Sequence, residues 1–493
     1  MAFCTIRTPD SYIDATFSRL SGFLQRYKVT ADCADSWAPG VCGYGIDEQC
    51  PASQDPRDNR WLVWAARYCE PDDEFLSQTT RTILSAAFTL DGVERHHLAA
   101  PDADDYHHYY IWWLLQVALG YLYTGDTLLD SQHLRRIVQT LFSVFDEADN
   151  GITSTAMYYF VTSIGEPANT DPGKAYSFYH STNLLFVLQQ FEHLANARGD
   201  TASAGYFRER AERLREQLQR FRSADGFYFA LRDFATGEYR YRVTGKEDLC
   251  LMTDNVFAPL AYRVLSAEEM EPSVDFLLAH LAHRFPVPYA YPSYRGVWTN
   301  AWWFPRSWQE PFAHYCLGLS ELEKPSLIYR AIQQLAHRIA QDDEVWEHYD
   351  PDTGEAQNYF IPPRSGYSTT CACFNIAVIE TLFGIRPLEP AFRRVSIRPA
   401  FPEDWAWAQI ETTVSGRRIC YTMTASPDRV IYDFRGSSAV EASLCLPLPA
   451  AWSGKPVEAN VPGVLRTMRG EPRPCFDTHL ALGETVVQLN VSA

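Results

Sequence analysis

Positive charge and long apolar runs are both scarce in this chain of 493 residues. Lys and Arg together number 43 against 61 Asp and Glu, which gives a formal net charge of −18. A chain this acidic lacks the basic face that attracts phosphates, so we expect neither nucleic acid nor an anionic membrane surface as a partner. Because no segment approaches 18 uninterrupted apolar residues, we also expect no membrane-spanning helix.

The first ten residues lack a basic segment followed by an apolar one, so the sequence shows no secretory signal. The 12 cysteines are scattered, which without a signal indicates free thiols in a reducing compartment. The close pair Cys371-Ala-Cys373 has no Cys/His partner pair at zinc-binding spacing, and its side chains would lie on different faces of a helix. We therefore expect a cytoplasmic protein with no metal site and no organic cofactor.

Helical periodicity dominates the chain as far as about residue 385. Residues 184–194 place large apolar side chains at spacings of three and four, and residues 207–221 repeat this pattern after Gly199-Asp200. A short polar link between two such stripes predicts an antiparallel helical hairpin. The same pattern predicts about a dozen helices in pairs, at 11–27, 59–69, 74–89, 109–124, 132–146, 184–194, 207–221, 254–264, 270–284, 308–320, 325–341 and 369–383.

The pattern changes after Gly384, between about residues 385 and 395. Segments such as RVIYDFRG at 429–436 and TVVQLNV at 485–491 alternate or carry β-branched runs, and Gly, Pro and Asp separate them. This predicts an antiparallel β-sandwich. We therefore expect two domains, a helical one over 1–385 and a β-sandwich over 386–493.

Aromatic side chains are concentrated in the predicted loops between helices. Loops on a rigid scaffold commonly carry function, and sugar rings stack on Trp and Tyr faces. This concentration predicts an aromatic-lined pocket for a carbohydrate at one end of the helical domain. The main groups are Tyr106 to Tyr110 with Trp112 and Trp113, Tyr289 to Tyr294, Trp298, and Trp302-Trp303-Phe304-Pro305-Arg306.

Glycoside cleavage needs two carboxyl groups, one to protonate the leaving oxygen and one to activate water or attack the sugar. Glu347 is the first candidate for the base. Glu166 and Asp171 lie in the loop 161–174 and are the candidates for the acid. The Asp47-Glu48 pair, in another Gly-rich loop, is a less favoured alternative.

The stretch VWEHYDPDTGEAQNYF at 345–360 places an acid, an imidazole and two aromatic rings directly before a predicted turn. Pro351 presets φ for this turn, and Gly354 supplies a permissive backbone. We expect the turn to fix the loop so that the Glu347 carboxylate faces the barrel axis, with Trp346 anchored behind it. The alternative is that Trp346 and Tyr349 are core residues and that Glu347 is solvated.

Several motifs resemble six-hairpin glycosidases with an (α/α)6 barrel. EHYDPDTGE at 347–355, followed by SGYSTTCACFNIAVIETLFGIRP at 365–387, looks like the last two hairpins of this superfamily. It includes processing α-glucosidase, mannosylglycerate hydrolase, trehalase and debranching enzymes, and the related α-L-rhamnosidases. GVWTNAWWFPRSWQEPFAHYCLGL at 296–319 resembles its Trp-rich wall, and FRRVSIRPAFPEDWAWAQ at 392–409 resembles the entry to the rhamnosidase β-domain. The resemblance implies a mainly α fold, an (α/α)6 toroid of helical hairpins with a C-terminal antiparallel β-sandwich.

The resemblance also implies catalytic roles. A Glu in a Glu-x-Tyr-x-Pro-x-Thr-Gly loop is the group's base, and Glu347 falls on it. The group's acid is usually an Asp about 180 residues upstream, a distance that both Glu166 and Asp171 fit. Rhamnosidases take their acid from an earlier Arg-Asp/Glu-Glu-Arg loop, and DPRDNRW at 55–61 resembles this loop only weakly.

We therefore expect an exo-acting, inverting glycoside hydrolase that cleaves an α-glucoside or an α-L-rhamnoside, with an oligosaccharide or glycoside as its partner. Glu347 would be the base, and Glu166 or Asp171 the acid. The expected substrate-binding residues are Trp302, Trp303, Arg306, His348, Tyr349, Tyr109, Trp112, Trp298, His180 and Tyr367.

Two other functions are compatible with the sequence. A uronic-acid lyase or hydratase on the same toroid would use a Tyr/His pair in a basic pocket, for which Arg295, Arg306, Arg364 and His180 are available. A catalytically inactive carbohydrate-binding protein would lack a competent acid near 166–171. A glycoside phosphorylase would need a phosphate site in place of the base, and the intact Glu347 argues against it.

Overall fold

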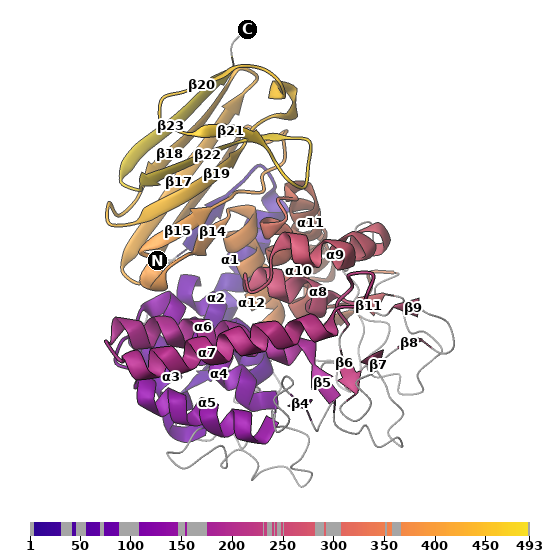
Figure 1. Ribbon diagram of the computed structural model, residues 1–493. Coiled ribbons are helices and arrows are strands. Elements are labelled where there is room, and N and C mark those ends of the chain that lie inside the picture. The colour runs from indigo at the N-terminus through magenta and orange to yellow at the C-terminus, as the bar shows by residue number, and fades with distance from the viewer. Residues whose placement is uncertain are drawn as a thin grey trace.

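A helical domain lies beneath a β-domain, and the first strand of the chain lies within the β-domain (Figure 1). The computed structural model describes residues 4–30, 42–45, 56–69, 73–87, 108–145, 153–154, 175–229, 231–233, 239–240, 242–243, 248–249, 251–281, 290–291, 307–350, 353–356 and 366–491. Among these residues, no helix combines the length and the apolar character that crossing a bilayer requires.

The α-helices of the described residues form two concentric rings. The inner ring is α2 (Pro56–Cys69), α4 (His108–Thr124), α6 (Phe178–Ala197), α8 (Thr253–Ala261), α10 (Gln309–Glu321) and α12 (Ser368–Ala377). Each inner helix contacts the next, and α12 closes the ring on α2. The outer ring is α1 (Ser11–Arg26), α3 (Asp73–Thr82), α5 (Ser131–Phe145), α7 (Thr201–Leu218), α9 (Ala267–Leu281) and α11 (Pro325–Asp342). The expected (α/α)6 toroid is confirmed, and its helices coincide closely with the predicted ranges.

The pattern of buried residues differs between the inner and the outer helices. Every residue of α8 and α12 is buried, because an inner helix touches protein on all sides. The outer helix α1 instead buries a single stripe that includes Ile13, Phe17 and Leu20. The side chain of Asp10 caps α1 by accepting hydrogen bonds from the N–H groups of Tyr12 and Ile13.

The six inner helices run in the same direction. In the N-terminal halves of these helices, Thr369 of α12 donates to Asp58 of α2, and Asp254 of α8 lies 2.6 Å from His314 of α10. At the opposite end, Tyr123 near the end of α4 meets Glu380, just after α12. We call the N-terminal end of the ring the mouth and the C-terminal end the closed end.

The β-domain is a sandwich of two sheets. One sheet has the order β1 (Cys4–Arg7), β16 (Trp407–Val414), β17 (Arg417–Ser426), β18 (Arg429–Arg435), β23 (Glu484–Val491) and β20 (Val457–Ala459). The other has the order β14 (Ile385–Pro387), β15 (Arg394–Ile397), β19 (Glu441–Pro447), β22 (Pro474–Ala481) and β21 (Val464–Thr467). Burial alternates along β16 and β18, as expected for strands with one face on a core. The predicted sandwich is confirmed, with one parallel pair, β15 and β19.

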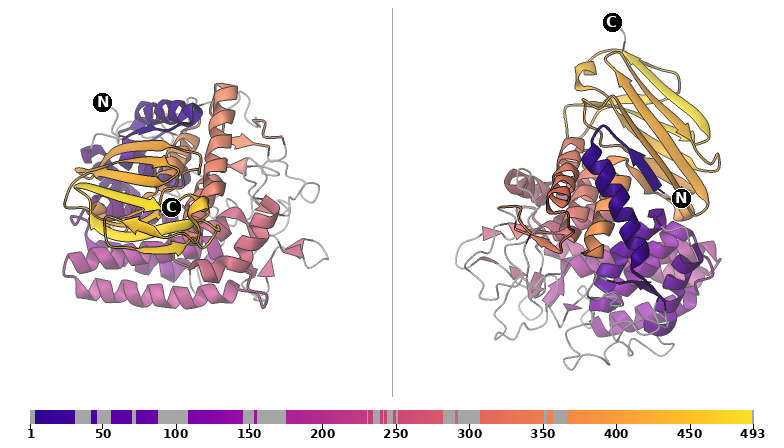
Figure 2. Two further views of the ribbon diagram at one scale, coloured as in Figure 1. Left: turned by 90° about the horizontal axis from the view of Figure 1, so that it is seen from above. Right: turned by 180° about the vertical axis from the view of Figure 1, so that it is seen from behind.

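Strand β1 pairs antiparallel with β16, with Cys4 opposite Thr412 and Arg7 opposite Gln409. Figure 2 shows β1 lying along the sandwich while α1 descends beside the barrel. The expected division into 1–385 and 386–493 did not anticipate this pairing of β1 with β16, and the division itself stays a prediction. A pairing across some four hundred positions leaves no local signal in the sequence.

Short strands supply the remaining sheets. They are β2 (Lys28–Val29), β3 (Gly43–Tyr44), β4 (Thr153–Ser154), β5 (Ala175–Ser177), β6 (Leu231–Asp233), β7 (Tyr239–Arg240), β8 (Arg242–Val243), β9 (Asp248–Leu249), β10 (Leu251–Met252), β11 (Ala290–Tyr291), β12 (Ser307–Trp308) and β13 (His348–Tyr349). Of these, β12 and β13 pair with each other and carry part of the candidate site.

Glu380 accepts several buried hydrogen bonds at the closed end. It lies in a π-helical turn, Val378–Leu382, that continues α12. Its Oε1 accepts hydrogen bonds from Trp64 Nε1 at 2.5 Å, from the Tyr68 hydroxyl at 2.8 Å and from the Tyr123 hydroxyl. Arg386 Nε, on the adjoining strand β14, lies 3.3 Å from Oε2. A buried carboxylate thus joins two inner helices to the start of the β-domain.

Candidate active site

Glu347 lies at the mouth, between α11 and β13, with a side chain that is 8% exposed. The backbone just before it is fixed to the first turn of α12. The N–H of Tyr367 donates to the carbonyl of Val345 at 3.2 Å, and Thr370 Oγ1 donates to the carbonyl of Trp346 at 2.8 Å. An inner helix of the barrel therefore positions the carboxylate.

The backbone after Glu347 makes the predicted turn. The N–H of Gly354 donates to the carbonyl of Asp350 at 2.8 Å, and the N–H of Thr353 donates to Asp350 Oδ1 at 2.9 Å. Gly354 has φ of +74°, in the left-handed region that glycine adopts without steric cost. Because β13 also pairs with β12, the chain is held on both sides of Glu347.

The imidazole of His348 lies close to the Glu347 carboxylate. Its Nε2 is 3.6 Å from Glu347 Oε1, and both side chains are largely shielded from solvent.

Asp58 lies at the same end, in the first turn of α2. Its Oδ1 accepts hydrogen bonds from the Tyr367 hydroxyl at 2.9 Å and from Thr369 Oγ1 at 3.0 Å. Tyr367, an expected substrate-binding residue, is therefore bonded to a buried carboxylate at the mouth. The two bonds hold the start of α12 against α2.

A buried cation, Arg60, lies two residues beyond Asp58 on α2. Arg60 is fully buried, and its Nη2 donates to the Tyr179 hydroxyl at 3.1 Å. Its guanidinium lies 4.9 Å from the ring centre of Trp112, within cation–π range. Burial, together with the charge of Arg60, lowers the pKa of His180 to about 3. His180 is therefore neutral at physiological pH, beside a permanent positive charge.

A buried acid–imidazole pair completes the axis. His314 Nδ1 lies 2.6 Å from Asp254 Oδ1, and His314 Nε2 lies 3.3 Å from the Tyr262 hydroxyl. Burial lowers the pKa of His314, while Asp254 opposes that shift. The ring of Trp61 meets His314 edge-on at 4.8 Å. Among the described residues, these buried side chains fill the barrel below the mouth.

All six inner helices direct their N-terminal ends toward the mouth. Helix macrodipoles place partial positive charge there. The net charge of −18 thus coexists with a local field that suits acidic groups at the mouth. The arrangement fits chemistry in which a carboxylate acts on a neutral substrate or on water.

Many expected site residues lie outside the described residues: Glu166, Asp171, Asp47, Glu48, Trp298, Trp302, Trp303, Arg306, Arg295 and Arg364. Tyr109 lies in the first turn of α4, but its side chain is not among those described. Their assignments stay predictions.

The described aromatic candidates are deeply buried. Trp112 is fully buried, and Tyr349 and Tyr367 are only 2% and 3% exposed. Tyr349 belongs to the main apolar core, and burial raises the pKa of its hydroxyl. Trp346 packs against the same core, as its predicted anchoring role requires. The burial of Tyr349 favours the alternative in which it is a core residue, and its role as a sugar platform stays a prediction.

The sequence analysis assigned no role to the axial residues Arg60, Tyr179, Asp254 and His314. Asp58 and Arg60 were considered there only as part of DPRDNRW. The available signal was polar residues inside apolar helices, since the triplet Thr253-Asp254-Asn255 and His314 each interrupt an otherwise apolar run. Such residues are buried only when they are paired, which made a partner predictable but not its identity.

The chain is similar to known proteins in one segment of its sequence and in its fold. Residues 165–369 match the family model described as "Mannosylglycerate hydrolase MGH1-like glycoside hydrolase domain". No curated protein matches the chain by sequence. The matched segment begins ahead of β5 and α6, ends at the start of α12 and includes Glu347.

Solved structures share the fold at low identity. The α-L-rhamnosidase from Dictyoglumus thermophilum has a TM-score of 0.65 and 11% identity, covering 100% of this chain and 51% of that one. The Streptomyces avermitilis α-L-rhamnosidase complexed with L-rhamnose has a TM-score of 0.63 and 12% identity, covering 100% and 42%. The GH63 mannosylglycerate hydrolase from Thermus thermophilus has a TM-score of 0.51 and 12% identity, covering 73% and 99%.

The expected resemblance is confirmed: the chain has the six-hairpin glycosidase fold, and its central segment matches a glycoside hydrolase domain. The chain spans about half the length, or less, of the rhamnosidase chains that it resembles.

Proposed function

We propose that the protein is an exo-acting, inverting glycoside hydrolase that cleaves an α-linked glycoside. The observation that carries the proposal is a shielded carboxylate, Glu347, fixed at the mouth of an (α/α)6 barrel by α12 on one side and by a tight turn on the other. The match of residues 165–369 to a glycoside hydrolase domain supports the same class.

In this mechanism Glu347 takes a proton from a water molecule as that water attacks the anomeric carbon. Glu166 or Asp171 gives its proton to the leaving oxygen. Inversion requires the two carboxyl groups to lie about 6.5–9.5 Å apart, so that a water molecule fits between one of them and the sugar. The buried floor formed by Arg60, Trp61 and His314 favours cleavage of a terminal sugar, because a chain could not pass along the axis.

The sugar is an α-glucoside or an α-L-rhamnoside in this proposal. The rhamnosidases among the structural relatives favour the second, because they match the whole chain, whereas the mannosylglycerate hydrolase matches about three quarters of it.

The test is release of nitrophenol from matched α- and β-nitrophenyl glycosides, with proton NMR of the first anomer formed. We expect one α-glycoside to be cleaved and the product to appear first with the opposite anomeric configuration. A product that first appears with retained configuration would contradict the inverting mechanism. Complete inactivity on terminal glycosides, with the chain folded, would contradict the exo-hydrolase assignment.

A uronic-acid lyase is the second candidate, because Tyr179 and His180 lie beside the buried Arg60. Such an enzyme uses a Tyr/His pair and a basic pocket. Its elimination product carries a carbon–carbon double bond that absorbs in the ultraviolet, whereas hydrolysis creates none. Ultraviolet absorbance that grows on incubation with oligouronates would favour the lyase over the hydrolase.

A further inference from the structure

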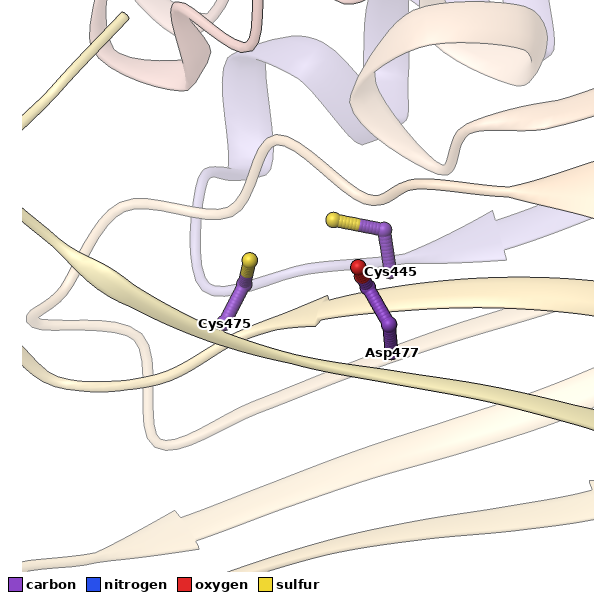
Figure 3. Close-up of side chains that lie close together, drawn as sticks. All are labelled: Cys445, Cys475 and Asp477. Carbon is purple, nitrogen blue, oxygen red and sulfur yellow. The ribbon is translucent and has the colours of Figure 1, made fainter. Parts of the chain in front are cut away.

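Three potential metal ligands converge in the β-domain, far from the mouth. Cys445 lies on β19, and Cys475 and Asp477 lie on the neighbouring strand β22. Cys445 is directly opposite Asp477 in the ladder, and Cys475 is two residues away on β22, so all three side chains share one face of the sheet. Figure 3 shows the three side chains gathered on the same side of the two strands.

Their ligand atoms are already close together. The two Sγ atoms and an Asp477 oxygen all lie within 4.8 Å of one another. Tetrahedral zinc with Zn–S bonds of about 2.3 Å holds its sulfur ligands about 3.8 Å apart. A shift of at most about 1 Å would therefore bring the three atoms to ligand distances, and both thiols are already shielded from solvent.

The sheet register disfavours a disulfide as an alternative. Cys475 is opposite Pro447, so Cys445 and Cys475 form a diagonal pair and not a directly opposed one. Diagonal partners have Cα atoms about 7–8 Å apart, whereas disulfides rarely span more than about 6.8 Å. An ion between the sulfur atoms satisfies this geometry without moving the strands.

Arg466 would support such a site. Its Nε lies 2.5 Å from Asp477 Oδ2, while Asp477 Oδ1 has only a 3.4 Å contact with Nη2 and remains available to an ion. Nη2 also lies 3.4 Å from Cys445 Sγ, where a guanidinium stabilises a metal-bound thiolate. Nη1 donates to Glu323 Oε2 at 2.7 Å, which links the cluster to the end of α10.

The charges and the space both suit a divalent ion. With both cysteines as thiols, Arg466, Glu323 and Asp477 sum to one negative charge. Binding one divalent ion while releasing two thiol protons leaves that sum unchanged. A void of about 10 Å³, room for one water-sized particle, adjoins the cluster and is lined by Cys445, Met468 and Glu323 among others.

We propose that Cys445, Cys475 and Asp477 bind one zinc ion, with a water or the Met468 thioether in the fourth position. A set of two thiolates and one carboxylate binds zinc in preference to calcium or magnesium. Because Glu323 belongs to the barrel and Arg466 to the sandwich, the ion would reinforce the contact between the two domains. The proposal is independent of the catalytic function, and it departs from the sequence expectation of no metal site.

The test is a cobalt titration of the reduced, chelator-treated full chain. Cobalt bound by thiolates gives a near-ultraviolet charge-transfer band and visible bands, which zinc then abolishes by displacement. Cys445→Ser and Cys475→Ser remove one ligand each. Cys420→Ser is the matched control, because Cys420 is a similarly buried cysteine in the other sheet of the sandwich.

The expected result is a thiolate band that saturates at one equivalent of cobalt in the parent and in Cys420→Ser. Either ligand variant should lose much of the band and weaken zinc binding by at least about 100-fold. Zinc should raise the melting temperature of the parent and of the control but not of the ligand variants, a readout that also shows whether each variant folds. A parent with no saturable band, or a band that survives both ligand substitutions, would overturn the proposal.

Discussion

Replacing Glu380 with alanine should destabilise the closed end of the barrel severely. Three buried donors, Trp64 Nε1 and the hydroxyls of Tyr68 and Tyr123, share its Oε1. A buried donor left without an acceptor costs about 1–3 kcal/mol. Tyr68 also has a 3.4 Å contact with the carbonyl of Ile385, so two donors lose their acceptor outright. The expected loss is about 3–5 kcal/mol, in the range observed when one member of a buried charged network is removed.

Two matched variants separate this explanation from simple loss of packing. Glu380→Gln keeps an acceptor oxygen but loses the charge, and should cost about 1–3 kcal/mol. Tyr123→Phe removes one donor, so combining it with Glu380→Ala should cost less than the sum of the two single changes. Arg386 keeps its 2.7 Å pair with Glu321 in all of these variants, so its charge is not left unpaired.

The assay is equilibrium unfolding in urea, followed by Trp fluorescence and by far-ultraviolet circular dichroism, because a two-domain chain need not unfold in one step. The transition that involves the helical domain should move to lower urea in Glu380→Ala. An unfolding midpoint that matches the parent, or fully additive double-variant losses, would refute the shared-acceptor account.

Four further predictions concern stability. Because the pKa of His180 is lowered to about 3, the folded protein binds fewer protons than the unfolded chain below about pH 6.5. Stability should therefore decrease as the pH is lowered through this range, and His180→Gln should flatten that slope. Burial opposes ionisation of Glu321, but Arg263 and Arg386 lower its pKa to about 2. The ionised Glu321 should therefore stabilise the fold above about pH 4.5, and this stabilisation should be lost as the pH falls toward 2. It should be absent at every pH in Glu321→Gln. Gly384→Ala should cost more than about 3 kcal/mol in urea unfolding, because φ is +71° and the new Cβ would lie 2.2 Å from the backbone of Arg398. Gly199→Ala, with φ of +73° and open space around it, should cost only about 1–2 kcal/mol.

Each of the two pH predictions has its own contradictory outcome, and the two glycine predictions share one. An unchanged slope between pH 6.5 and 4.5 in His180→Gln would show that His180 is not held neutral. An unchanged loss of stability below pH 4.5 in Glu321→Gln would show that Glu321 does not supply it. Equal losses in the two glycine variants would show that the close approach of Arg398 has no consequence.

Local features of this chain were predictable because their signals lie within a few residues. The Pro351 and Gly354 pattern predicted a turn, and the turn is closed by hydrogen bonds to Asp350. The apolar stripes of residues 184–194 and 207–221 predicted α6 and α7, which form the expected hairpin. Periodicity carries this information because the same residues that form each helix also form its buried face.

Distant pairings were not predictable by the same reasoning. Asp254 and His314 are 60 residues apart, and Glu380 and Tyr68 are 312 apart, so no local pattern links either pair. The closeness of Cys445 to Cys475 likewise depends on the register of β19 with β22. Each pairing follows from how the helices and strands are arranged in space, which the sequence pattern does not specify.

The most direct test of the central claim is the turnover of Glu347→Gln on whichever glycoside the parent cleaves. Glutamine keeps the size of the side chain but cannot take a proton from water, so kcat should fall by about 10²–10⁴-fold while the chain stays folded. Glu355→Gln, an exposed acid in the same turn, is the matched control and should retain parent turnover. Parent-like turnover in Glu347→Gln would contradict the assignment of Glu347 as the general base.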